Sequence, residues 1–298
     1  METRGIRGAY HYNDKVFLKR QTEGSVICTS CGVLVGVNDD TCYNCGRRNP
    51  GLWGYGPALR RLGQDMGFVP LMMGTTITLY ALSVLMSRSG LEAMLAPNTE
   101  ILFLLGASGS VPVIGYGRWW TVLTAGWLHG GVLHVLFNVL WIRQLAPAVA
   151  DMYGPARMAI IYVLAGVAGF ALTTFVAAYF PIPIRGLSGA QITVGASANI
   201  FGLLGATVYY GRRTGSSIAS QTGIQYALIL GLFGFISTGV DNMAHAGGFA
   251  GGYLVSLLLD PLKRERIDQM VIALALLVVS FIALAASVIT ALPLLLQA

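Results

Sequence analysis

Seven long apolar runs limit what this chain can fold into more than any other feature of its sequence. Each run comes close to the length of about 20 mostly apolar residues that an α-helix needs to cross the hydrocarbon core of a bilayer. The sequence therefore predicts an all-α polytopic membrane protein with seven spans. They lie at roughly residues 68–87, 121–142, 157–180, 195–211, 222–240, 242–259 and 270–292.

The charged residues indicate a small polar head on a membrane-embedded body. Only 11% of the 298 residues are charged and the mean hydropathy is +0.66, whereas an ordinary soluble domain carries about 25% charged residues. Residues 1–70 hold 15 charged side chains, while residues 71–298 hold only 17. A soluble enzyme is disfavoured. The net charge of +6 does not indicate a nucleic-acid partner, because the basic residues of the body are scattered between apolar runs.

The basic residues of the short connections indicate the orientation, since such residues are enriched on the cytoplasmic side. With a cytoplasmic N-terminus, nine basic residues fall inside and three outside. We therefore expect a bacterial-type inner or plasma membrane, with the head in the cytoplasm and the C-terminus outside. The inside set is Arg60, Arg61, Arg143, Arg157, Arg212, Arg213, Lys263, Arg264 and Arg266, and the outside set is Arg88, Arg118 and Arg185.

Two further features of the body concern its packing. The connection between the first and second spans, about 88–120, has a short apolar stretch at 101–105 and the aromatic residues Tyr116, Trp119 and Trp120. It is too interrupted to span, so we predict a structured, interfacial loop. Gly, Ala and Ser recur in the fourth and sixth spans, and small residues let helix backbones approach closely in lipid. These two helices are therefore expected to be neighbours.

Polar side chains suited to chemistry occur in three of the predicted spans. His134 and Asn138 share one face of the second span because they are four residues apart. Ser197 stands near the start of the fourth span and His245 near the start of the sixth. These three spans run in the same direction, so the four side chains should lie at similar depth. His129 lies five residues before His134 and is expected to point elsewhere or to sit at the helix entrance.

These residue types are the parts of nucleophilic acyl transfer. A serine needs a base, which a histidine can supply, and hydrogen-bond donors can stabilise the oxyanion that forms. The acidic residue nearest to His245 is Asp241, at the mouth of the sixth span, so a Ser-His dyad is expected rather than a triad. Taken singly, each residue has a simpler interpretation, since a membrane serine most often bonds to its own backbone.

The three segments together resemble the rhomboid intramembrane serine proteases. The resemblance covers about residues 68–260 and implies a rhomboid-like six-helix core with one extra C-terminal transmembrane helix. It implies that Ser197 is the nucleophile, that His245 is the general base, and that His134, Asn138 and the Ser197 N–H form the oxyanion hole. No cofactor would be needed for catalysis. The matching segments are HGGVLHVLFN at 129–138, GAS at 195–197, IFGLLGA at 200–206, and DNMAHAGG at 241–248 with Gly252.

Two positions depart from the pattern of that family. Its members often carry a Trp-Arg pair before the second span, where this chain reads Arg118-Trp119-Trp120-Thr121. This departure bears on how the long loop is held in place. The residue after the serine is Ala198, where glycine is common, and this small change should leave the chemistry intact.

The head contains two CxxCG knuckles, Cys28 to Gly32 and Cys42 to Gly46, with ten residues between Cys31 and Cys42. Four thiolates in this pattern are typical of a closed structural zinc site, which leaves no open position for catalysis. We expect Cys28, Cys31, Cys42 and Cys45 to bind one zinc ion in a zinc-ribbon-like domain. A redox dithiol or a pair of disulfides is the alternative. The predicted organisation is a head at 1–49 with the ribbon at 25–48, an interfacial linker at 50–67, a membrane domain at 68–260, and the linker and seventh helix at 261–298.

The residues favour acyl-transfer chemistry, and the resemblance implies an intramembrane serine endopeptidase that cleaves transmembrane proteins, with the lipid bilayer and those substrates as partners. A second hypothesis is a non-catalytic membrane protein that holds transmembrane helices and recruits a cytoplasmic partner through the zinc head. A third is a transporter with a histidine proton relay, which the lack of buried carboxylates disfavours. Cleavage of a generic helical substrate distinguishes the three.

Overall fold

The chain divides into two compact units, Met1–Met66 and Gly67–Ala298. The structure, a computed structural model, describes residues 20–29, 31–60, 65–87, 95–180, 182–184 and 186–296. The outer residues Arg88 and Arg185, and Arg61 of the inner set, lie outside these ranges.

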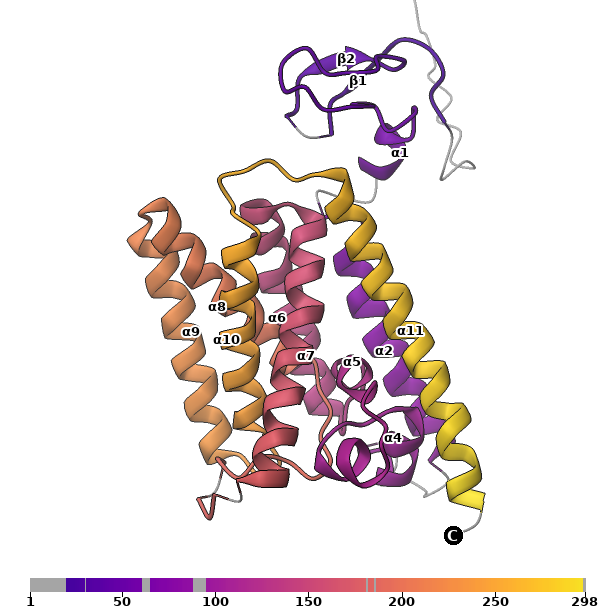
Figure 1. The fold of residues 1–298 in the computed structure, drawn as a ribbon, viewed down its shortest axis with the longest axis vertical. Coiled ribbons are helices and arrows are strands. Elements are labelled where there is room, and N and C mark those ends of the chain that lie inside the picture. The colour runs from indigo at the N-terminus through magenta and orange to yellow at the C-terminus, as the bar shows by residue number, and fades with distance from the viewer. Residues whose placement is uncertain are drawn as a thin grey trace, which may run out of the picture. The chain divides into compact units, whose positions relative to one another are not determined.

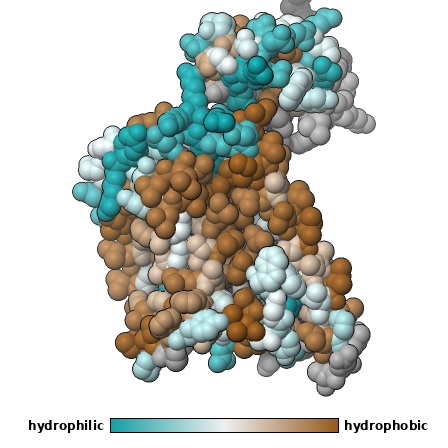
Figure 2. Space-filling view, viewed as in Figure 1, coloured by the Kyte–Doolittle hydropathy of each residue, from teal (hydrophilic) through white to brown (hydrophobic). Residues whose placement is uncertain are grey.

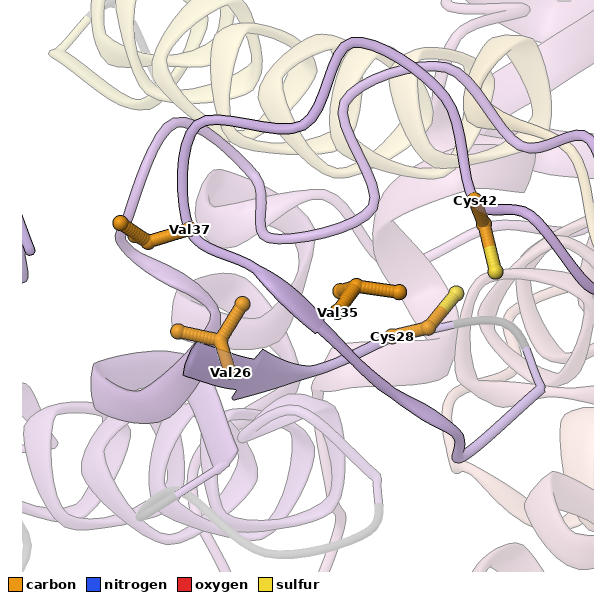
Figure 3. Close-up of a cluster of buried hydrophobic side chains, with 5 residues drawn as sticks. All are labelled: Val26, Cys28, Val35, Val37 and Cys42. Atoms are coloured by element: carbon orange, nitrogen blue, oxygen red, sulfur yellow. The ribbon is translucent and has the colours of Figure 1, made fainter. Parts of the chain in front are cut away.

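The N-terminal unit is built around one small hairpin. Strands β1 (Ser25–Ile27) and β2 (Leu34–Gly36) pair antiparallel, with Val26 opposite Val35. A short helix, α1 (Gly56–Arg60), follows. The buried core consists of Val26, Cys28, Val35, Val37 and Cys42 (Figure 3). So few apolar side chains cannot stabilise a fold by themselves, and two of the five are cysteines.

The second unit is a bundle of long helices (Figure 1). This arrangement confirms the predicted all-α polytopic class. In the described residues, α2, α6, α7, α9 and α11 are long and apolar enough to cross a membrane. α8 and α10 do not meet that criterion, because α8 is more polar and α10 is shorter. The helices are α2 (Phe68–Met86), α6 (Val132–Tyr153), α7 (Pro155–Tyr179), α8 (Ser197–Thr214), α9 (Ser217–Ile236), α10 (Asn242–Leu258) and α11 (Ile267–Leu296).

The surface of this unit fits a bilayer. On the face shown in Figure 2, apolar side chains cover the middle of the helical unit and polar residues gather toward its ends. The lipid-facing character is strongest in α9, where only Gly223 and Gly234 are buried. α8 differs, because most of its residues are covered by neighbouring helices. A helix so enclosed can carry polar side chains without exposing them to lipid.

The predicted position of the second span along the chain was wrong. The structure places α6 at Val132–Tyr153, whereas the sequence predicted a helix over 121–142. Residues 121–131 are apolar because they are buried in protein: Trp127 is 2% exposed and Leu128 is 1% exposed. Gly130 and Gly131 then separate this segment from the helix. Arg143, assigned above to an inside connection, consequently lies within α6.

The connection before α6 is folded, as predicted, and it extends to residue 131. It contains α4 (Thr99–Leu105), a π-turn (Val111–Gly115), α5 (Thr121–Thr124) and a 3₁₀ turn (Ala125–Trp127). Residues 88–94 of this segment lie outside the described ranges. Its apolar residues form one core with α11, made of Leu102, Leu105, Ala107, Leu128 and Leu284.

Helices α8 and α10 pack closely, which confirms that the fourth and sixth predicted spans are neighbours. A Cβ added to Gly248 would collide with the carbonyl of Ala198, and one added to Gly252 would collide with the carbonyl of Gly202. Both glycines lie on the face of α10 that also carries His245, three and seven residues further on. Close backbone contact therefore fixes the separation of the two helices on the side where His245 lies.

A buried arginine holds the connection between α10 and α11. Arg157, expected in an inside connection, lies in the first turn of α7 and is 2% exposed. Its guanidinium donates to the carbonyls of Asp260, Lys263 and Arg264 and to the side chain of Gln269. Backbone carbonyls thus surround the charge and attach the beginning of α11 to α7.

Candidate active site

The side chains of Ser197 and His245 meet at the interface of α8 and α10. The Oγ atom of Ser197 lies 2.8 Å from Nε2 of His245, within hydrogen-bond distance. Ser197 is the first residue of α8, and His245 stands in the first turns of α10. The start of α10 is fixed by Asp241, whose side chain accepts from the N–H of Ala244.

The imidazole of His245 is held by its ring face as well. The ring of Phe201 stacks on it with centroids 4.2 Å apart and planes 12° apart. Phe201 lies one turn after Ser197 on α8, so the residue that packs on the imidazole projects from the same helix as the Ser197 hydroxyl. His245 is 7% exposed, and its Nδ1 has no hydrogen-bond partner among the described residues. Within the described part of the chain, the Ser197–His245 pair therefore has no carboxylate on Nδ1.

His134 lies against the backbone that precedes Ser197. Gly195 has φ +132°, and a Cβ at this position would come within 2.6 Å of the His134 ring atoms Cε1 and Nε2. Only a glycine allows both this backbone conformation and this close approach. Asn138 is buried one turn later on α6, and its Nδ2 donates to the carbonyl of His134 at 2.8 Å. One N–H of the Asn138 amide is therefore used within the helix.

His129 has a role that the sequence did not reveal. It lies in the connection before α6, is fully buried, and its Nε2 accepts a hydrogen bond of 3.2 Å from the N–H of Ala196. Its ring also contacts that of His134 edge to face, with centroids 5.0 Å apart. His129 thus holds the residue immediately before Ser197. The signal available in the sequence was its place before Gly130-Gly131, where the helix has not yet begun.

Further residues of the long connection bond to the same segment. The N–H of Gly195 donates to the carbonyl of Ala125, and Ser108 forms a backbone bridge with Thr193. The connection is itself held by Arg118, which is 2% exposed and donates to the carbonyls of Phe103 and Ser287 at 2.8 Å each.

An arginine therefore does attach the long connection to its surroundings, although Thr121 stands at the position where arginine is often found. This arginine is Arg118, just before the tryptophan pair. Thr121, which stands where the family often has arginine, donates to the carbonyl of Arg118. It thus fixes the backbone of the residue that makes the attachment.

The four cysteines of the head meet the requirements of a metal site. Their sulfur atoms all lie within 4.8 Å of one another. The Sγ atoms of Cys28 and Cys45 are 3.7 Å apart and those of Cys31 and Cys42 are 3.6 Å apart. Four sulfurs placed tetrahedrally at about 2.3 Å from zinc would be separated by about 3.8 Å. Figure 3 shows the sulfurs of Cys28 and Cys42 pointing toward each other.

The two knuckles have the same backbone geometry. The N–H of Gly32 donates to the carbonyl of Cys28, and the N–H of Gly46 donates to that of Cys42. Both glycines have positive φ, +78° and +68°, as the tight turns require. Hydrogen bonding, first of all from the backbone of Val33, lowers the pKa of the Cys31 thiol to about 7. This favours the thiolate form that binds metals.

The sequence matches a known family over the region that contains Ser197 and His245. Residues 116–264, half of the chain, match the Rhomboid domain. The helical bundle, the Ser-His pair at its α8–α10 interface and this match agree, and the chain belongs to the rhomboid family. It is accordingly a multi-pass integral membrane protein.

Individual relatives extend the comparison. Rhomboid protease GluP of Bacillus subtilis is 33% identical over 184 residues, which cover 61% of this chain and 34% of GluP. YdcA of the same organism is 31% identical over 156 residues, 51% of this chain and 73% of YdcA. RHOMBOID-like protein 4 of Arabidopsis thaliana is 29% identical over 174 residues, 56% of this chain and 40% of that protein. The chain thus matches less than half the length of two of these three relatives.

Proposed function

We propose that this protein is an intramembrane serine endopeptidase that cleaves transmembrane proteins through a Ser197–His245 dyad. The observation that carries the proposal is the 2.8 Å contact between Ser197 Oγ and His245 Nε2. It is made between α8 and α10, where glycines of α10 lie directly against the backbone of α8. Ser197 is the first residue of α8, so no carbonyl of its own helix lies four residues earlier, and its hydroxyl is directed to His245. The names of the relatives, which include a rhomboid protease, support the same class of activity.

The dyad supplies both partners of the first chemical step. His245 takes the proton of the Ser197 hydroxyl while Oγ attacks the carbonyl carbon of the scissile peptide bond. The imidazolium then gives that proton to the leaving amine, the C–N bond breaks, and an acyl-enzyme ester remains. Water, deprotonated by the same imidazole, attacks the ester. The new carboxyl terminus leaves and the Ser197 hydroxyl is regenerated.

The oxyanion hole is assigned to His134, Asn138 and the backbone N–H of Ser197. His134 lies against Gly195, next to the nucleophile, and Asn138 follows it on the same face of α6. The Ser197 N–H stands at the start of α8, where helix N–H groups have no intrahelical acceptor and favour negative charge. Donors of this kind act best when the protein fixes them before the substrate binds, and Asn138 is buried.

The head is proposed to face the cytoplasm and the dyad the outer leaflet. Arg212, Arg213, Lys263 and Arg264 gather at the ends of α8 and α10 that are remote from Ser197, and Arg157 lies buried beside the latter two. This distribution follows the positive-inside rule. A bacterial-type inner or plasma membrane suits the reducing conditions that four thiols need on the cytoplasmic side.

The head is proposed to be a structural zinc domain that recruits a cytoplasmic partner. Four thiolates would hold one ion in a closed site, and the bound ion would replace the apolar core that the unit lacks. Catalysis requires no cofactor in this scheme.

A fluorophosphonate probe tests the proposal most directly. Purified protein should be labelled once, on Ser197, and Ser197→Ala should abolish both labelling and cleavage of a helical transmembrane substrate. Ser256→Ala is the matched control, because Ser256 is a buried membrane serine whose hydroxyl donates to the carbonyl of Gly252 in its own helix. Equal labelling of Ser197→Ala and wild type would overturn the dyad and favour a non-catalytic helix-binding protein.

A further inference from the structure

An apolar groove runs along α8, α9 and α10 and ends at the proposed active site. It has a volume of about 790 Å³ and is lined mainly by apolar side chains, including Phe201, Ile224 and Phe249. One end is formed by Asn242 and His245, and the other by Arg212 and Tyr253. The groove therefore connects the proposed base with the opposite end of α8.

The polar atoms of Asn242 are buried without partners. The residue is 6% exposed, and neither Oδ1 nor Nδ2 has a hydrogen-bond partner among the described residues. The amide is held between two glycines, because a Cβ on Gly186 would approach Nδ2 and one on Gly234 would collide with Oδ1. Nδ1 of His245, on the next turn of α10, is unpartnered as well. Leaving buried polar groups unpaired is costly, so this end of the groove is suited to a polar ligand group.

We infer, on the basis of the proposed function, that Asn242 binds the peptide backbone of the substrate segment next to the scissile bond. A carboxamide offers a donor and an acceptor, which match the C=O and N–H of a peptide group. The acyl chain of a lipid offers neither. Asn242 is thus a substrate-binding residue distinct from the dyad and the oxyanion hole.

The length of the groove fits a short extended segment. From Phe201 to Arg212 the groove follows eleven residues of α8, about 16 Å at 1.5 Å per residue. An extended chain of about five residues has the same length. A helix pairs its own backbone N–H and C=O groups, so the substrate residues that bond to Asn242 must be extended.

Kinetics with two variants test this inference. Asn242→Leu removes the hydrogen bonds at similar volume, and Asn242→Ala avoids any clash. Each should be labelled by fluorophosphonate as fast as wild type, because the small probe does not use the groove. With a transmembrane peptide substrate, KM should rise about tenfold, as expected for loss of one or two hydrogen bonds, with kcat changed less. Leu257→Ala, on the exposed side of α10, should match wild type.

A modified substrate makes the test independent of folding. A series of peptides, each N-methylated at one residue beside the cleaved bond, should contain one member whose KM rises about tenfold with wild type and does not rise further with Asn242→Ala. Unchanged KM in labelled Asn242 variants would overturn this inference alone. So would a KM that responds to Arg212→Gln but not to Asn242→Ala, which would indicate an anionic lipid in the groove. Wild type that is neither labelled nor active would overturn the proposed function itself.

Discussion

Arg118 donates a hydrogen bond from Nη2 to the carbonyl of Ser287 and so joins the connection before α6 to α11, 169 residues later in the sequence. Its Nη1 donates to Phe103, and the guanidinium also lies 4.4 Å from the centre of that ring. Nε1 of Trp120 donates to the hydroxyl of Ser287. α11 is therefore part of the structure that holds the connection before α6 in place.

Replacing Arg118 should loosen this attachment. Charge-assisted hydrogen bonds each contribute about 1.5–3 kcal/mol, so Arg118→Ala should lower the free energy of unfolding by about 3 kcal/mol or more and reduce cleavage. Arg118→Lys should recover only part of it, because an ammonium cannot reach two carbonyls in the same fork. Thermal unfolding in detergent measures the effect, with exposed Arg266→Lys as control. An unchanged melting temperature in Arg118→Ala would show that these bonds do not hold the loop.

Removal of either member of the dyad should abolish cleavage. Ser197→Ala and His245→Ala are each expected to be inactive, and the double variant should be no worse than either, because nucleophile and base act as a unit. Single-turnover cleavage of a transmembrane peptide gives the rates. Additive losses in the double variant would mean that the two residues act independently.

The oxyanion donors should contribute less than the dyad. Loss of one donor typically slows the chemical step about 10²–10³-fold, so His134→Ala and Asn138→Ala should each reduce kcat while fluorophosphonate labelling persists at a lower rate. Asn138→Ala should have the smaller effect if the bond from its amide to the His134 carbonyl persists during the reaction. Wild-type rates in both variants would remove these residues from the mechanism.

A larger residue between α8 and α10 should separate the dyad. Gly248→Leu and Gly252→Leu place a side chain where the carbonyls of Ala198 and Gly202 now lie. Overpacking of this kind costs about 1–3 kcal/mol or more, so activity and melting temperature should fall together. Gly74→Leu on α2, where nothing lies within 4 Å of an added Cβ, is the control. Normal activity with leucine at position 248 would be incompatible with the close contact described above.

The head should bind one zinc ion that is separable from the chemistry. Elemental analysis should give a ratio near one per chain, reduced by Cys42→Ser but not by Tyr43→Ser, an exposed neighbour in the same knuckle. Deletion of residues 1–48 should leave fluorophosphonate labelling intact, because a closed four-thiolate site has no open position. A metal-free head with four reactive thiols in a chelator-free anaerobic preparation would contradict the zinc assignment.

The sequence alone determined the class of the molecule, because the signals for it are local. A membrane helix can be recognised in a sequence by the length and low polarity of its apolar run. Six of the seven long helices in the described residues accordingly lie within a few residues of their predicted positions. The cysteine knuckles follow from spacing and from the turns at Gly32 and Gly46, and the order of the three motifs indicated the family. Ser197 and His245 could also be chosen as candidate site residues, because each stands at the start of a predicted span.

The tertiary structure decided what depends on contacts between distant segments. An apolar run has the same composition whether protein or lipid covers it, so only the fold shows that residues 121–131 are buried in a loop and that α6 begins at Val132. The partners of His129 and Arg118 lie on other elements, and the Asn242 amide has none among the residues that the structure describes. No local pattern in the sequence indicates these facts. The physical reason is that hydrogen bonds of buried polar groups are satisfied by geometry in three dimensions, which the order of residues along the chain does not reveal.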